Sequence, residues 1–92
     1  MTRAQLRMFI RRRNAGGWPV TALEFRSDCR ACGFAVGDLG PARYLPVSPG
    51  VTCWYWRTRH GILAEVEGRL TLHRSERAFW RAVGARQPAP DL

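Results

Sequence analysis

Apolar residues near the N-terminus recur at the spacing of an amphipathic helix, which we expect over residues 4–14. The residues that would share its buried face are Leu6, Phe9 and Ile10. Thr2 stands before this segment and Gln5 follows three residues later, which is the spacing of a capping box. The segment is followed by residue types that do not continue a helix well: Gly16, Gly17 and Pro19.

Residues 21–50 carry a less regular pattern. Residues 21–25 alternate and predict a short strand, and residues 34–36 predict a second one. The turn expected between them, over residues 27–33, holds two of the three cysteines. Residues 37–50 contain three glycines and three prolines, which predict a long loop or an irregular edge of a sheet.

Alternating apolar and polar residues predict a β-hairpin in the second half of the chain. The alternation covers residues 51–58 and resumes over residues 62–72. Residues 67–69 either form a second tight turn or continue the strand, and the turn is favoured. That turn would divide the second run into two strands of a meander.

The register of the hairpin follows from the way it sorts side chains between two faces. A three-residue loop over residues 59–61, ending in a glycine, is a common connection and sets Trp54 opposite Val66. The apolar residues gathered on that face are then Trp54, Trp56, Ile62, Ala64 and Val66. A two-residue loop would set the tryptophans opposite glutamates, so the three-residue register is favoured.

A second helix is expected over residues 76–83, because Ser75 can cap its start and Gly84 can end it. The order of helix, antiparallel strands and helix predicts an α+β domain. In it, an N-terminal helix precedes an antiparallel β-meander of about four to five strands, and a C-terminal helix packs on one face of the sheet. Both helices are expected on the face that carries Trp54 and Trp56.

The chain of 92 residues has the size of one domain. We expect that domain over residues 1–86, followed by a flexible, proline-containing tail over residues 87–92. No apolar run approaches the roughly 20 residues of a membrane span, and the arginine-rich start differs from a secretory signal. These features predict a cytoplasmic protein without a membrane partner, and they leave the oligomeric state open.

All 15 basic side chains are arginines, and with only 7 acidic ones they give a net charge of +8. Arginine in place of lysine is typical of a GC-rich genome and changes no charge, whereas the surplus predicts an anionic partner. That partner would be nucleic acid, or an acidic protein or nucleoprotein surface. Three of the arginines in the first helix lie four residues apart along one stripe. The residues expected to bind the partner are Arg3, Arg7, Arg11, Arg12, Arg13, Tyr55, Arg57, Arg59, Arg77 and Arg81.

Residues 54–60 interleave aromatic and basic side chains, as single-stranded nucleic-acid sites do. Trp54 and Trp56 face the same way as Ile62 in the predicted hairpin, so we favour a place in the core for both of them. A stacking platform is the alternative. Tyr55 is the aromatic residue expected on an open face.

The segment Cys29-Arg-Ala-Cys32-Gly resembles one knuckle of a zinc ribbon, where two thiolates hold one tetrahedral ion. Cys53 would be the third ligand, but it lies about 20 Å from His60 along the predicted strand, so the two cannot share an ion. Buried, apolar cysteines are therefore favoured. Any zinc would use Cys29, Cys32 and Cys53, with Asp28 or a second chain completing the site. A redox pair is disfavoured because no predicted helix begins at Cys29.

The sequence has two histidines and no dense acidic cluster, so it offers no recognisable catalytic apparatus. We therefore expect a non-enzymatic binding module that engages nucleic acid or a nucleoprotein complex through an arginine-rich surface. One alternative is a small phage or mobile-element protein that inhibits a host defence complex by protein–protein binding, in the manner of anti-CRISPR proteins. A third is a small structural-zinc module.

Overall fold

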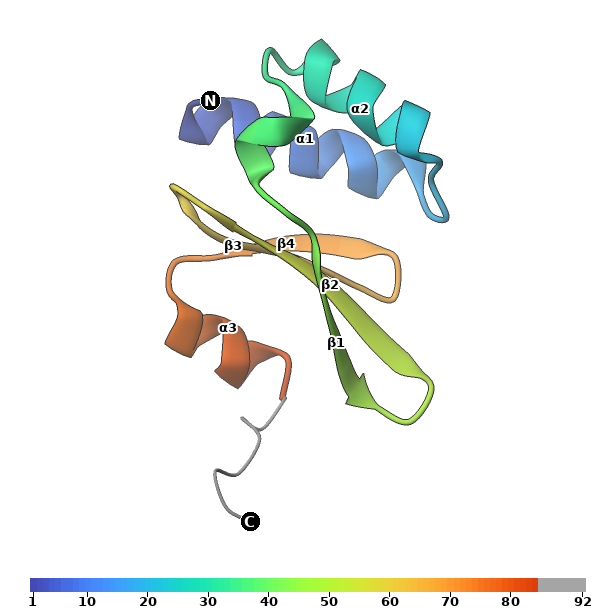
Figure 1. The fold of residues 1–92 in the computed structure, drawn as a ribbon, viewed down its shortest axis with the longest axis vertical. Coiled ribbons are helices and arrows are strands. Elements are labelled where there is room, and N and C mark those ends of the chain that lie inside the picture. Colours follow the sequence, from blue (N-terminus) through green and yellow to red (C-terminus); the bar gives the residue numbers. More distant parts are fainter. Residues whose placement is uncertain (85–92) are drawn as a thin grey trace.

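A computed structural model describes residues 1–84, and the predicted α+β class is confirmed (Figure 1). Four antiparallel strands form one sheet in sequence order: β1 (Arg43–Ser48), β2 (Val51–Thr58), β3 (Gly61–Val66) and β4 (Arg69–His73). One face of the sheet is covered by α1 (Arg3–Gly16), α2 (Ala22–Ala31) and the 3-10 helix η1 (Val36–Leu39). Helix α3 (Glu76–Ala82) covers the other face. The domain end expected at residue 86 and the tail over residues 87–92 lie outside the described residues.

Helix α1 begins with the predicted capping box. The hydroxyl of Thr2 accepts the N–H of Gln5 at 3.1 Å, and the side-chain oxygen of Gln5 accepts the N–H of Thr2 at 2.7 Å. Leu6 and Phe9 are fully buried, as the helical spacing predicted. The helix ends before Gly17, whose φ of 77° lies in the left-handed region that favours glycine.

The strand expected over residues 21–25 is wrong, because these residues begin α2. Thr21 forms a second capping box, in which its hydroxyl and the carboxylate of Glu24 accept each other's backbone N–H at 3.1 Å. Helical geometry then sets the ring of Phe25 edge-on to Phe9, with 5.2 Å between the ring centroids. Five alternating residues are too few to define a strand against a cap and a buried aromatic contact.

Two further expectations in this segment are corrected. The turn predicted over residues 27–33 is mostly helix, since α2 continues to Ala31 and the backbone turns only at Cys32. The strand predicted over residues 34–36 does not form. Phe34 instead packs its ring edge-on against Phe9, with centroids 5.5 Å apart, because a buried aromatic contact outweighs a three-residue apolar run.

Of the two structures expected over residues 37–50, the irregular sheet edge is the one that forms. Strand β1 lies at one end of the strand order and pairs only with β2. The register shifts between Pro46 and Ser48. A proline is tolerated here because an edge strand leaves one side of its backbone unpaired.

The predicted register of the β2–β3 hairpin is wrong by one residue. The loop between the strands has two residues, so Trp56 lies opposite Leu63. Trp54 lies opposite Glu65, whose buried carboxylate accepts the N–H of Gly68 at 2.6 Å. A slip of one residue turns every side chain of β3 to the other face. The predicted register depends on a sheet with one buried face. Four consecutive residues of β3 are buried, so the alternation of apolar and polar residues does not show which face of β3 lies in the core.

The second tight turn is confirmed between β3 and β4. Glu67 and Gly68 have φ angles of 51° and 82°, and Val66 pairs with Arg69 across them. Two successive positive φ angles are typical of the two-residue turn whose twist matches that of the flanking strands.

Helix α3 packs on the face opposite to the one expected. Its Phe79 belongs to a buried cluster with Cys53, Ile62 and Ala64. Trp56 lies in a separate cluster beneath α1 and α2. The sheet therefore divides two cores, and α3 covers the second because β3 presents apolar side chains on both of its faces.

An Asn14→Ala variant should lose about 1–2 kcal/mol of unfolding free energy, because it leaves two backbone groups without their partner. The amide of Asn14 donates to the carbonyl of Leu70 at 3.0 Å and accepts its N–H at 2.7 Å, so it ties α1 to the edge strand β4. Urea denaturation measures the loss. Met8→Ala, at an exposed position of the same helix, is the control, and an equal loss in both variants would contradict the role of Asn14.

Candidate functional site

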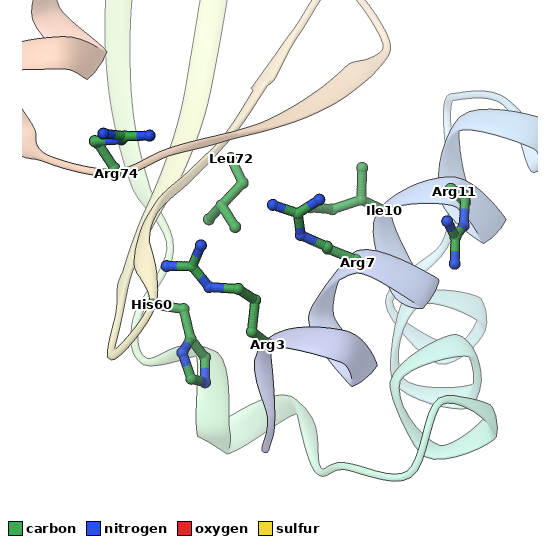
Figure 2. Close-up of a pocket in the computed structure, with 7 residues that line it drawn as sticks. All are labelled: Arg3, Arg7, Ile10, Arg11, His60, Leu72 and Arg74. Carbon is green, nitrogen blue, oxygen red and sulfur yellow. The ribbon is translucent and has the colours of Figure 1, made fainter.

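A groove of about 370 Å³ lies between α1, the β2–β3 loop and the end of β4 (Figure 2). We call it the cationic groove, and the residues that line it are Arg3, Arg7, Ile10, Arg11, His60, Leu72 and Arg74. The set consists of four arginines, one histidine and two apolar residues. The groove therefore gathers positive charge from α1 and from the segment after β4, which are distant in the sequence.

Three of the groove arginines form a line along α1. Arg3, Arg7 and Arg11 are spaced four residues apart, so each Cα lies about 6 Å further along the helix axis than the one before. Arg74 follows β4, and Figure 2 shows Arg3 and Arg7 extending from α1 toward Leu72 with Arg74 beyond it. The sequence predicted the stripe on the helix but gave no signal for Arg74, which joins it only through the packing of α1 against β4.

The groove is uncompensated within residues 1–84. None of its lining residues is acidic. The ion pairs formed in the described chain involve Arg12, Arg13 and Arg57, and none of them involves a groove arginine. Four guanidinium groups with no carboxylate partner nearby create a positive potential that an anion would relieve.

His60 anchors the wall of the groove. Its Nε2 atom lies 3.0 Å from the backbone oxygen of Met1. A carbonyl oxygen can only accept, so Nε2 carries the proton and donates this hydrogen bond. The contact holds the β2–β3 loop against the start of α1 and fixes the distance between the two sides of the groove.

Arg12 and Arg13 do not join the groove, because both bind Asp28 of α2. The Nε atom of Arg12 lies 2.6 Å from Oδ1 of Asp28, and Arg13 binds Oδ2 and also donates to the carbonyl of Gly17 at 2.5 Å. The side chain of Arg13 is only 7% exposed. Hydrogen bonds from Arg12 and Arg13 lower the pKa of Asp28, and the same carboxylate raises the pKa of Arg12. These two arginines hold α1 to α2.

Tyr55 and Arg57 lie on the α3 side of the sheet. The ring of Tyr55 packs against Phe79, with centroids 5.1 Å apart, so the expected open face is wrong. It is wrong because α3 covers that side. The Nε atom of Arg57 donates to Glu76 at 2.9 Å, and this hydrogen bond raises the pKa of Arg57.

The remaining predicted residues are exposed and dispersed. Arg59 lies in the β2–β3 loop beside His60. Arg77 and Arg81 lie on α3, across the sheet from α1. The ten residues predicted from the sequence therefore do not form one surface, and Arg3, Arg7 and Arg11 are the ones that line a common groove.

The three cysteines are buried as free thiols and are not brought together. Cys29 and Cys32 lie in the cluster beneath α1 and α2, whereas Cys53 lies in the cluster beneath α3, on the other side of the sheet. Within residues 1–84 no three or more histidine, cysteine or acidic side chains gather in a metal-binding arrangement. The zinc ligands considered from the sequence thus lie in two different cores.

Native protein should react slowly with iodoacetamide at pH 8. Burial raises the pKa of Cys29 from 9.0 to about 12 and that of Cys53 to about 11. These shifts lower the thiolate fraction about 1,000-fold and 100-fold, and only the thiolate reacts. Mass spectrometry of the alkylated peptides, with urea-unfolded protein as the control, measures the two rates. Alkylation of native Cys29 as fast as in urea would contradict the buried placement.

Fold and site together define a small α+β domain that carries a cationic groove beside its first helix. No helix within the described part of the chain is both long and apolar enough to cross a membrane. Comparison of the chain with protein families, with curated proteins and with solved structures found no match.

Proposed function

We propose that this chain is a non-enzymatic binding module whose cationic groove engages the phosphate backbone of nucleic acid. The observation that carries the proposal is the convergence of four arginines, free of ion pairs within residues 1–84, on one groove. The planar guanidinium matches the geometry of phosphate oxygens and binds them through two parallel hydrogen bonds.

The shape of the charged surface favours a polyanion over a single small anion. The Cα atoms of Arg3 and Arg11 lie about 12 Å apart along α1, so the arginines present positive charge along a line of that length. A chain of phosphates provides charges at successive positions along such a line. Contacts of this kind position a nucleic acid without selecting its sequence, so we expect binding that is independent of sequence.

A pair of charge-reversed variants tests the proposal. Arg3→Glu/Arg7→Glu removes two groove arginines, and Arg77→Glu/Arg81→Glu makes the same change in charge at the same spacing on α3. Fluorescence anisotropy with a labelled duplex at low salt should show at least about tenfold weaker binding for the groove variant. The α3 variant should lose much less.

Two outcomes would contradict the proposal. Equal losses in both variants would mean that overall charge, and not the groove, attracts the nucleic acid. No binding by the wild-type protein at low salt, together with a partner in a lysate pull-down that survives nuclease treatment, would instead favour the alternative of an inhibitor that binds an acidic protein.

A further inference from the structure

A second cavity, of about 460 Å³, opens between α2 and strand β2, and its lining is rich in aromatic side chains. We call it the aromatic pocket, and the residues used below are Trp18, Phe25, Arg26, Trp54 and Trp56. Its volume falls within the roughly 300–1,000 Å³ of small-ligand pockets. It shares no lining residue with the cationic groove.

The aromatic pocket has a buried base and an open aromatic rim. Trp56 is 7% exposed, and Phe25 stacks on it with a centroid distance of 5.6 Å and an interplanar angle of 21°. At the rim, Trp54 is 42% exposed and its neighbour Tyr44 is 53% exposed, with their rings edge-to-face at 5.2 Å. Adjacent exposed aromatic rings beside a cavity are typical of a surface that binds another molecule.

Positive charge borders this pocket. Arg26 lines it and also lines an adjacent cavity of about 380 Å³ that contains Arg30. The two arginines are four residues apart on α2, are exposed and form no ion pair within residues 1–84. A flat aromatic surface next to a row of arginines is the combination that single-stranded nucleic-acid sites use, with bases on the rings and phosphates on the cations.

We infer that the aromatic pocket receives a base of single-stranded nucleic acid, which stacks on Trp54 while Arg26 and Arg30 contact the adjacent phosphates. The inference rests on the proposed function and adds to the groove a second contact that only a single strand can make. A base within a duplex is stacked on both sides and must be extruded before it can enter a pocket. An apolar protein side chain would use the rings but leave the two arginines without a counter-charge.

Trp54→Ala tests the inference in the full chain, with labelled oligothymidylate and a duplex of the same length as probes. The variant should bind the single strand about 5- to 150-fold more weakly, the equivalent of the 1–3 kcal/mol that one stacked base contributes. Its affinity for the duplex should stay that of the wild type, because the cationic groove is intact. Trp54→Phe keeps a stacking face and should retain most of the single-strand affinity.

Leu23→Ala is the matched control, since Leu23 is an exposed apolar residue of α2 that does not line the pocket. Arg26→Glu provides a second variant and should weaken single-strand binding with oligothymidylate as the probe. If the wild-type protein binds both probes and Trp54→Ala binds the single strand unchanged, the aromatic pocket is not the site, while the proposed function stands. If the wild-type protein binds neither probe, both fail.

Discussion

An Asp28→Asn variant should lose about 2–4 kcal/mol of unfolding free energy in urea denaturation, a large share of the stability of a small domain. Asp28 is the shared acceptor of Arg12 and Arg13, and it joins α1 to α2. The side chain of Arg13 is buried, its Nε atom forms no hydrogen bond within residues 1–84, and Asp28 is the carboxylate that its guanidinium pairs with. Removing the carboxylate charge therefore leaves a desolvated guanidinium without a counter-ion.

The same contacts make stability depend on acid pH. Hydrogen bonds from Arg12 and Arg13 hold the pKa of Asp28 below its ordinary value of 3.8. The folded state thus favours the carboxylate, so its contribution is complete above the unfolded pKa and is lost as the pH falls through the lower, folded value. The difference in unfolding free energy between wild-type protein and Asp28→Asn should shrink below about pH 4.

Glu67→Gln supplies the control for this experiment. It removes the same charge from an exposed turn between β3 and β4, and Glu67 forms no ion pair within the described residues. Its unfolding free energy should stay within about 0.5 kcal/mol of the wild-type value. Similar losses in the two variants, or an Asp28→Asn protein as stable as the wild type, would show that the Asp28 contacts do not stabilise the fold.

Raising the salt concentration from about 50 to 200 mM should weaken duplex binding about 150-fold. Each groove arginine that neutralises a phosphate releases condensed counter-ions, and four such contacts give a slope of about −3.6 in a plot of log K against log salt. A duplex is the appropriate probe because we expect the aromatic pocket to exclude it. Anisotropy titrations across this range of salt measure the slope.

The charge-reversed variants sharpen the measurement. Arg3→Glu/Arg7→Glu should flatten the slope by about 2, because two phosphate contacts are lost. The matched change at Arg77 and Arg81 should leave the slope close to that of the wild type. A wild-type slope near zero would mean that phosphates do not supply the binding energy, and it would end the nucleic-acid proposal.

Local hydrogen bonds explain why some elements could be predicted and others could not. Two local features could be predicted: the cap formed by Thr2 and Gln5, and the turn at Glu67 and Gly68. Each involves residues at most three positions apart, so the residue types at those positions indicate it. The same capping signal was present at Thr21 and would have revealed α2. The alternation over residues 21–25 points to a strand instead, and the two local signals conflict.

The candidate sites divide in a similar way. The stripe of Arg3, Arg7 and Arg11 follows from helical spacing, and the structure places all three in one groove. The exposure of Trp54 and the partial burial of Tyr55 could not be foreseen, because they depend on which helix covers which part of the sheet. The basic-aromatic segment did contain an exposed ring, but at a position neighbouring the one expected.

By itself, the sequence determined the α+β class, the start of α1, the strands β2 to β4 and the surplus of positive charge. Each of these features depends on local periodicity or on composition, and both can be read from residues that are neighbours in the sequence. The end of α1 lies at Gly16, two residues beyond the predicted one. Only the tertiary structure decided the register of the β2–β3 hairpin and the presence of a second core under α3. It also decided that Arg74 lines the same groove as the α1 arginines and that Arg13 forms an ion pair with Asp28. Those features arise from contacts between segments that are distant in the sequence. In β3, where both faces are buried, the alternation of polar and apolar residues that indicates a register is also absent.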